Sequence, residues 1–367
     1  MNTDARSIRI EAINRREFLF NGSDVQPLSL CHALRNVPLS SFATLLPYPQ
    51  KPKPDDIVLV KLDKIGKNGR LELVDGRPRT LYVGDLLAMV FGNRYATNQF
   101  EGYARAKGDT CEILSMGGLC GLVESKHASV REPSKLRMIG ALGDTQEHPL
   151  NLRDFGLARV CNTTKSRIVA VCGTSMDSGK TYTAKSIITG LRKSGSRVAG
   201  VKLTGTATGR DTWQMQDAGA CPAFDFIDGG FASTYLLSLD ELLDLANRLF
   251  SQAAAQEAEY IVVEIADGLL QRETAALLKS SAFVNMVDAW VFAASESMAA
   301  VEGVRLLRSC GIEPMAISGV VSMSPLGMRE TEAVTGVPCF TAGQLQSGKM
   351  NEKLMAKQTG IEVVAAS

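Results

Sequence analysis

The chain has 367 residues, which is long for one hydrophobic core and predicts two domains, residues 1–150 and 151–367. Its composition is 45% hydrophobic and 22% charged, which is typical of a globular protein. The net charge is +1, so the protein has no strong overall electrostatic field that would favour binding to nucleic acid or to an acidic membrane. Neither a membrane-spanning apolar stretch nor a secretory signal is present, so we expect a cytoplasmic protein.

The N-terminal part has the alternating pattern of β-strands. A proline-rich connector at residues 47–54 is followed by alternating segments at 57–62, 70–74 and 79–83. Asn68-Gly69 and Asp75-Gly76 separate these segments, and both dipeptides favour tight hairpin turns, so we expect a β-meander. Apolar segments at 86–91, 111–114 and 119–123 extend the pattern. The prediction is a smaller β-rich domain, a barrel or a sandwich, followed by a polar junction at residues 143–167.

From residue 168 onward, short apolar runs alternate with amphipathic helix patterns. Ser238 and Glu241 have the spacing of a capping box, and Gly195 and Gly311 are placed to end two other helices. The apolar runs have the near-continuous hydrophobicity of strands buried on both faces. They are residues 168–172, 198–203, 260–265, 289–294, 315–321 and 337–340. This alternation predicts an α/β fold with a doubly wound, mostly parallel sheet.

One loop, residues 173–181, has the pattern of a phosphate-binding loop between the first apolar run and the next helix. Successive backbone N–H groups and the helix N-terminus attract phosphate there, so the domain is predicted to be a P-loop NTPase. Lys180 would reach the β- and γ-phosphates, and Thr181 would offer its hydroxyl to Mg²⁺. We expect ATP as the nucleotide, with GTP as an alternative. The expected nucleotide-binding residues are Gly173, Thr174, Ser175, Met176, Ser178, Gly179, Lys180, Thr181 and Tyr182.

Two charged residues in the apolar runs are further candidates. Lys202 ends a run on the side where ligands collect in open α/β sheets, so we expect it to bind a phosphoryl group or a substrate carboxylate. Glu264 lies inside an apolar run, and a Mg²⁺ contact would offset the cost of burying its carboxylate.

Aspartates provide the remaining candidates. Asp211 is the expected second carboxylate at the metal, because it is the aspartate closest to the end of the second run; the alternatives are Asp217, Asp225 and Asp267. Each of them could equally serve as a turn or cap residue. Asp177, within the loop, would contact substrate or orient water, and it completes the expected catalytic set with Lys180 and Lys202.

The loop signature Gly-Thr-x4-Gly-Lys-Thr resembles that of dethiobiotin synthetases and the related cobyric acid synthase-like ATPases. Residues 198–202 are similar to the second strand of that family, whose lysine faces the phosphates and substrate. Residues 262–270 resemble the segment whose glutamate approaches Mg²⁺, with Ile265 and Asp267 in place of small residues. Residues 318–321 resemble a strand that precedes a base-recognising Asn, but Ser322 follows here, so the choice between adenine and guanine stays open. The resemblance covers residues 168–344 and implies an ATP-dependent ligase.

A second resemblance is to a two-domain P-loop family that includes D-glutamate N-acetyltransferases. It is carried by Thr208-Gly209-Arg210-Asp211, Asp217-Ala218-Gly219-Ala220 and Asp225-Phe226. Members of that family carry a Rossmann-like N-terminal domain, which the hairpin pattern of this chain does not match.

Three functions therefore stand as alternatives. The first is an enzyme that uses ATP and Mg²⁺ to activate a small carboxylate, carbamate or amine by phosphoryl transfer. The second is an accessory or regulatory GTPase or ATPase in which hydrolysis drives a conformational change. The third is acyl transfer to an amino acid. The expected partners are a small-molecule substrate and neither nucleic acid nor membrane, with a homodimer left open.

Overall fold

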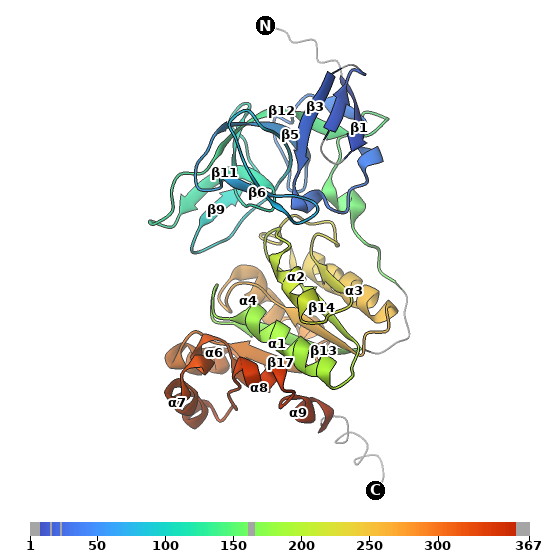
Figure 1. The fold of residues 1–367 in the computed structure, drawn as a ribbon. Coiled ribbons are helices and arrows are strands. Elements are labelled where there is room, and N and C mark those ends of the chain that lie inside the picture. Colours follow the sequence, from blue (N-terminus) through green and yellow to red (C-terminus); the bar gives the residue numbers. More distant parts are fainter. Residues whose placement is uncertain (1–7, 15–16, 23, 161–165, 357–367) are drawn as a thin grey trace. The chain divides into compact units, whose positions relative to one another are not determined.

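The computed structural model describes residues 8–14, 17–22, 24–160 and 166–356, and its fold is drawn in Figure 1. The chain divides into two compact units. Unit 1 comprises the described residues up to Leu157 together with Thr206–Gly209 and Phe226–Tyr235. Unit 2 comprises the described residues among Ala158–Gly205, Arg210–Asp225 and those from Leu236 onward. Two short segments of the C-terminal half therefore belong to the N-terminal unit.

Unit 1 is built from β-strands, as its alternating sequence predicts. Ten of them form one sheet in the order β4-β1-β2-β3-β8-β5-β12-β10-β11-β9, and β8 also pairs with β11. Strands β5, β8, β11, β10 and β12 thereby close into a ring, and β6 and β7 form a separate hairpin. The strands are β1 (Ile8–Asn14), β2 (Glu17–Phe20), β3 (Asp24–Leu30), β4 (Thr44–Leu46), β5 (Ile57–Lys64), β6 (Arg70–Glu72), β7 (Pro78–Thr80), β8 (Leu86–Phe91), β9 (Phe100–Tyr103), β10 (Thr110–Ile113), β11 (Leu119–Lys126) and β12 (Lys135–Gly143). Three 3₁₀ turns accompany them, η1 (His32–Leu34), η2 (Leu39–Ser41) and η3 (Leu152–Phe155).

The meander expected in this unit is only partly present. Asp75-Gly76 does connect a hairpin, because β6 pairs with β7 and Gly76 has a φ of 86°. The expected hairpin at Asn68-Gly69 is wrong, since β5 pairs with β8 and β12 instead of β6. The buried Asn68 amide donates to the carbonyl oxygen of Ile113 at 3.0 Å, so this residue ties a loop to a distant strand.

Unit 2 has an α/β fold whose six-stranded sheet has the order β15-β14-β16-β13-β17-β18. All its strand pairs are parallel. The strands are β13 (Arg167–Gly173), β14 (Val198–Lys202), β15 (Ala223–Asp225), β16 (Tyr260–Glu264), β17 (Ala289–Ala293) and β18 (Ala316–Ser318). The helices are α1 (Lys180–Lys193), α2 (Arg210–Asp217), α3 (Leu239–Ala255), α4 (Arg272–Lys279), α5 (Ser281–Val284), α6 (Ser297–Ser309), α7 (Pro325–Thr335), α8 (Ala342–Gln346) and α9 (Asn351–Ala356), with the 3₁₀ turn η4 (Val320–Met323). Within the described ranges, no helix has both the length and the apolar character needed to cross a membrane.

Alternate residues of the buried strands pack on opposite sides of this sheet. Val169, Val171 and Val262 share one core with the apolar face of α1. On the other side Phe292 of β17 meets α6, where a Cβ at Gly303 would overlap its ring. Both sides of the sheet are therefore covered by helices, and the carboxyl ends of the parallel strands meet along one edge.

The segment between β14 and β15 contains a short helix. Residues 210–217 form α2, although only Thr212 and Met215 of this helix are buried. Two buried positions in eight residues give a weak periodic signal, which explains why the sequence pattern did not indicate a helix. As a result, Asp211 lies in the first turn of a helix, where an acidic side chain is stabilised by the helix dipole.

Candidate phosphate and metal site

The expected phosphate loop joins β13 to α1 at the carboxyl edge of the sheet in unit 2. Gly179 precedes the helix with a φ of 97°, a left-handed conformation that glycine adopts without strain. Because the N-cap residue Gly179 has no side chain to cap the helix, the first N–H groups of α1 keep the capacity to bind an anion. Strand, loop and helix are thus arranged as the predicted phosphate loop requires.

Lys180 is folded back into this loop. Its Nζ donates to the carbonyl oxygen of Ser175 at 2.5 Å, and the side chain is almost fully buried. Burial lowers the pKa of Lys180 and the nearby Lys202 ammonium lowers it further, while Glu264 acts in the opposite direction. An anion inside the loop would favour the charged form of this ammonium, because opposite charges attract strongly where water is excluded.

Two neighbouring turns pack closely on the loop, and the sequence patterns did not single them out as contacts. After β18, the N–H of Val320 donates to the carbonyl oxygen of Ser178 at 3.1 Å. A Cβ on Gly319 would overlap that same oxygen, and a Cβ on Gly268 after β16 would overlap the carbonyl oxygen of Thr174. Glycines at 319 and 268 therefore let both turns touch the loop backbone.

A compact group of charged side chains lies beside the loop. Lys202 Nζ is 2.6 Å from Glu264 Oε1 and 2.8 Å from Asp211 Oδ2. Thr181 Oγ1 donates to Glu264 Oε1 at 2.9 Å and approaches Asp211 Oδ1 at 3.4 Å. The register explains the first contact, since Lys202 and Glu264 are directly paired on neighbouring parallel strands. The structure thus brings together four residues that are up to 83 positions apart in the sequence.

Opposite charges control ionisation in this group. Burial alone would lower the pKa of Lys202, but Asp211 and Glu264 raise it well above its usual value. Burial alone would raise the pKa of Asp211, but the Lys202 ammonium and a Thr181 hydrogen bond hold it below its usual value. Lys202 and Asp211 are therefore both charged at neutral pH.

The polar atoms at this site fit a phosphate and a divalent cation. Within the described part of the chain, the buried Glu264 Oε2 and Ser178 Oγ have no hydrogen-bond partner. Buried polar atoms of this kind are costly unless a ligand satisfies them. No group of three or more His, Cys, Asp or Glu side chains suited to a metal occurs among the described residues. A Mg²⁺ ion here would therefore take most of its ligands from phosphate and water, as is usual for this ion.

The remaining expected residues occupy different positions. Asp177 is exposed within the loop with a φ of 63°, and Asp267 follows β16 with a φ of 60°. Tyr182 is 53% exposed on α1, with the Lys185 ammonium 4.4 Å from the centre of its ring. Thr174 and Ser175 contribute backbone contacts to the loop, and Met176 is half-buried within it.

The alternative carboxylates Asp225 and Asp217 take different positions. Asp225 is buried on β15, where it pairs in register with Lys202. Asp217 is exposed at the far end of α2. Asp211 contacts both Lys202 and Thr181, as expected from the sequence for the second carboxylate.

Comparisons with known proteins found similarity to solved structures alone, at low identity. No family model matches the chain, and no curated protein matches it. Among solved structures, the signal recognition particle 54 kDa protein from Aeropyrum pernix in complex with GDP is 20% identical, covers 55% of this chain and has a TM-score of 0.37. The signal recognition particle receptor FtsY from Elizabethkingia anophelis in complex with GDP is 14% identical, covers 52% of this chain and has a TM-score of 0.35.

The chain spans 51% and 64% of the lengths of these two proteins. Similarity at this level does not define a function. Neither structure belongs to the dethiobiotin synthetase branch, so that narrower resemblance is not supported by them.

Proposed function

We propose that unit 2 binds a nucleoside triphosphate with Mg²⁺ and acts on its terminal phosphoryl group. The observation that carries this proposal is the arrangement of Lys180, Thr181, Lys202, Glu264 and Asp211 around one loop at the carboxyl edge of a parallel sheet. Ligands bind at this edge in open α/β folds. The buried Glu264 Oε2 and Ser178 Oγ support the same assignment, since a bound ion and its water or phosphate ligands would satisfy them.

Each residue has a role in this proposal. The loop backbone and Lys180 bind the phosphates, and Lys202 neutralises negative charge on the group that is transferred. Thr181 and Glu264 hold Mg²⁺ directly or through water, with Asp211 as the second carboxylate. The ion, when bound, stabilises the charge that develops on the phosphate oxygens.

We place hydrolysis first among the reactions, and phosphoryl transfer to a small carboxylate or amine second. The first is favoured by the path of the chain, because the residues between Lys202 and Asp211 include Thr206–Gly209, which belong to unit 1. Such an arrangement is suited to a module in which the nucleotide state is passed to another part of the chain. ATP and GTP both remain candidates for the nucleotide.

Binding is tested by calorimetric titration of the full chain with slowly hydrolysed ATP and GTP analogues in the presence of Mg²⁺. Lys180→Ala should weaken binding about tenfold to a hundredfold, the loss expected for a charge-assisted hydrogen bond. Lys185→Ala is the matched control, since this lysine lies on the same helix and contacts Tyr182 and Gln214. Equal affinities for the wild type and Lys180→Ala would contradict the proposal.

The acceptor is tested by measuring release of the nucleoside diphosphate. Release without any added acid or amine supports hydrolysis, whereas release that depends on one member of a metabolite panel supports the transferase alternative. Consumption of acetyl-CoA without diphosphate formation would contradict both and favour acyl transfer.

A further inference from the structure

A short segment that connects two residues of the site is bound by unit 1. Thr206–Gly209 follow β14, which ends at Lys202, and precede α2, which carries Asp211. The N–H of Ala207 donates to the carbonyl oxygen of Ala232 at 2.9 Å, and Thr206 forms an antiparallel bridge with Ser233. Both partners belong to unit 1 as well, so the segment is a built-in part of that unit.

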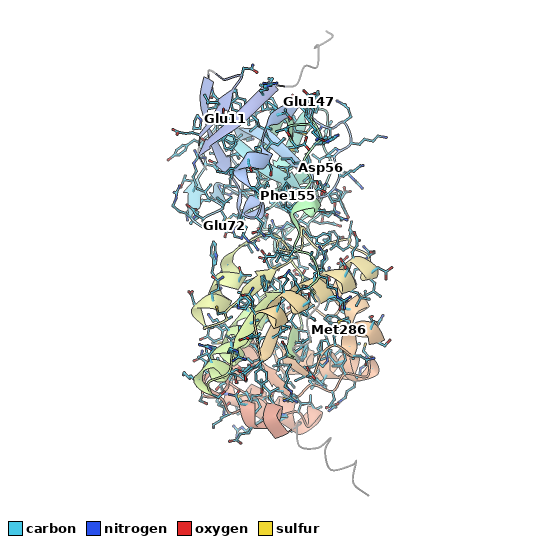
Figure 2. The ribbon with its side chains drawn as sticks, turned by 90° about the vertical axis from the view of Figure 1, so that its right-hand side faces the viewer. Glu11, Asp56, Glu72, Glu147, Phe155 and Met286 are labelled. Carbon is cyan, nitrogen blue, oxygen red and sulfur yellow. The ribbon has the colours of Figure 1, made fainter. Side chains whose placement is uncertain are left out.

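Glu72 makes the most specific contact with this segment. It is the last residue of β6, and it is labelled in Figure 2. Its Oε1 accepts from the N–H of Gly209 at 2.9 Å, and its Oε2 accepts from Thr208 Oγ1 at 3.1 Å. Each carboxylate oxygen therefore has a donor in the segment, and hydrogen bonds to a charged acceptor are about twice as strong as neutral ones.

The environment of Glu72 makes this contact rigid. The Glu72 side chain is buried, and its own N–H donates to the carbonyl oxygen of Met116 at 2.8 Å. Gly117, which follows Met116, lies so close to the segment that a Cβ there would overlap the carbonyl oxygen of Ala207. A buried carboxylate and a close backbone approach together fix the position of residues 207–209 in unit 1.

The contact lies next to Asp211 along the chain. Only Arg210 separates Gly209 from Asp211, and α2 begins at Arg210. Glu72 thus binds the backbone immediately ahead of the first turn that carries Asp211. The Asp211 carboxylate must be held at 2.8 Å from Lys202 and near Thr181 to take part in the site. The backbone that Glu72 binds therefore continues, after one residue, into the turn that carries this carboxylate.

We infer that Glu72 is a positioning residue for Asp211, and that unit 1 thereby sets the affinity of the site for its divalent cation. This inference rests on the proposed function of unit 2. Glu72 acts through the Thr208 hydroxyl and the N–H of Gly209, the two groups that its carboxylate accepts from ahead of α2. Residues that orient a metal ligand from behind change metal affinity or activity about tenfold to a hundredfold when they are replaced.

The test compares the wild type with Glu72→Ala, Glu72→Gln and Thr208→Val in the full chain. Two quantities are measured: the affinity for the nucleotide in EDTA, and the Mn²⁺ concentration that gives half-maximal nucleotide turnover. Glu72→Ala should leave the first unchanged and raise the second about tenfold or more. Glu72→Gln should recover part of the loss, because its amide oxygen still accepts from Gly209 while its NH₂ group cannot accept from Thr208.

Thr208→Val removes one hydrogen bond at nearly constant side-chain volume. It should raise the Mn²⁺ concentration for half-maximal turnover by a smaller factor than Glu72→Ala does. This variant keeps the test valid if Glu72→Ala fails to fold. Glu124→Ala is the control, since this exposed glutamate of unit 1 contacts Arg105 instead of the segment. An unchanged Mn²⁺ requirement in Glu72→Ala and Thr208→Val would overturn the inference, as would an equal loss of metal-free nucleotide affinity. If the wild type itself binds no nucleotide, the proposed function of unit 2 fails instead.

Discussion

Lys202 is the cation that separates two carboxylates, and its removal gives the sharpest test of the site. Lys202→Met keeps the length and the apolar stem of the side chain but deletes the ammonium. Glu264, which is 1% exposed, and Asp211 would then face each other without the positive charge that lies 2.6 and 2.8 Å from them. Breaking a buried ion pair by removing one partner costs about 3–5 kcal/mol.

The lower end of that range applies here, because the side chain of Asp211 keeps 21% of its exposure and water screens its charge. A loss of about 3 kcal/mol corresponds to a decrease in Tm of roughly 6–12 °C for a unit of about 200 residues. Thermal unfolding followed by circular dichroism, without nucleotide or divalent ions, measures this directly. Lys185→Met on α1 is the control, since its ammonium contacts an exposed ring and an amide, and we expect a change of less than about 1 kcal/mol.

Two further measurements separate electrostatics from lost packing. Mg²⁺ should raise the Tm of Lys202→Met more than that of the wild type, because the ion can replace the missing positive charge between the carboxylates. The difference in stability should also shrink with acid. The pKa of Asp211 is held below 3.8 in the folded wild type, so its stabilising effect is present above that pH and is lost as the pH falls through the lowered value. The reasoning would be refuted if the Tm of Lys202→Met lay within about 2 °C of the wild-type Tm, a margin that corresponds to less than 1 kcal/mol. It would also be refuted if Mg²⁺ raised the Tm of both proteins equally.

Two other predictions concern the support of the loop and the pH dependence of unit 1. Gly319→Ala should weaken nucleotide binding about tenfold or more, because the new Cβ would overlap the Ser178 carbonyl and because essentially only glycine adopts the backbone conformation at this position (φ 90°, ψ −155°). The control is Gly311→Ala, at a position with a φ of 75° where a Cβ would have no atom within 4 Å. Equal nucleotide affinities of the two variants would count against the contact. Burial, followed by the Arg35 charge, lowers the pKa of His32 from 6.5 to about 3, so between these pH values the unfolded chain binds more protons than the folded one. The free energy of unfolding should therefore decrease by up to about 1.4 kcal/mol for each pH unit as the pH falls from 6.5 toward 3. Urea unfolding from pH 7 to pH 4 should show a flatter profile for His32→Gln, and identical profiles would contradict a neutral buried imidazole.

The His32 environment contains opposing influences, and their balance decides that prediction. Glu72 Oε1 lies 3.9 Å from His32 Nδ1, and a carboxylate at this distance favours the protonated ring. Arg35 lies closer, with Nη1 at 3.2 Å from Nε2, and the ring is almost fully buried. The Leu73 backbone hydrogen bond and the Asp228 charge also raise the pKa of His32. Burial and the nearer Arg35 cation outweigh these influences, so we expect a neutral imidazole at pH 7.

The elements that sequence reasoning located in unit 2 are those with strong local signals. The capping box at Ser238 and Glu241 is formed at the start of α3, and five of the six continuous apolar runs contain buried strands. The expected strand at residues 337–340 is wrong, since only an isolated bridge from Cys339 to Ile317 forms there. The strand, loop and helix around Gly179 are likewise encoded by residues close together in the chain. Lys202 and Glu264 lie side by side because their parallel strands are paired in register, and their chemical roles stay predictions.

Non-local pairing explains what the sequence did not reveal. The β5 strand pairs with β8 and β12, and no local pattern distinguishes these partners from β6, which follows it in the chain. The close contacts of Gly268 and Gly319 with the phosphate loop depend on turns that are remote in sequence. Glu72 gave no signal either, because a glutamate at the end of a short strand is usually a solvated side chain.

The assignment of residues 226–235 to unit 1 shows why a single boundary near residue 150 cannot describe this chain. Phe226, Ile227 and Phe231 are each less than 5% exposed, and the buried Asp55 accepts from the N–H of Ala232 at 2.9 Å. Burial of three such side chains stabilises a fold by roughly 1.5–3 kcal/mol each, so unit 1 depends on residues supplied from within the C-terminal half. The connections that leave β14 and β15 both pass through unit 1 before they return to unit 2. Composition changes along the sequence detect the crossing at the end of the β-rich part but neither of these two, because segments of four and ten residues are too short to alter a local average.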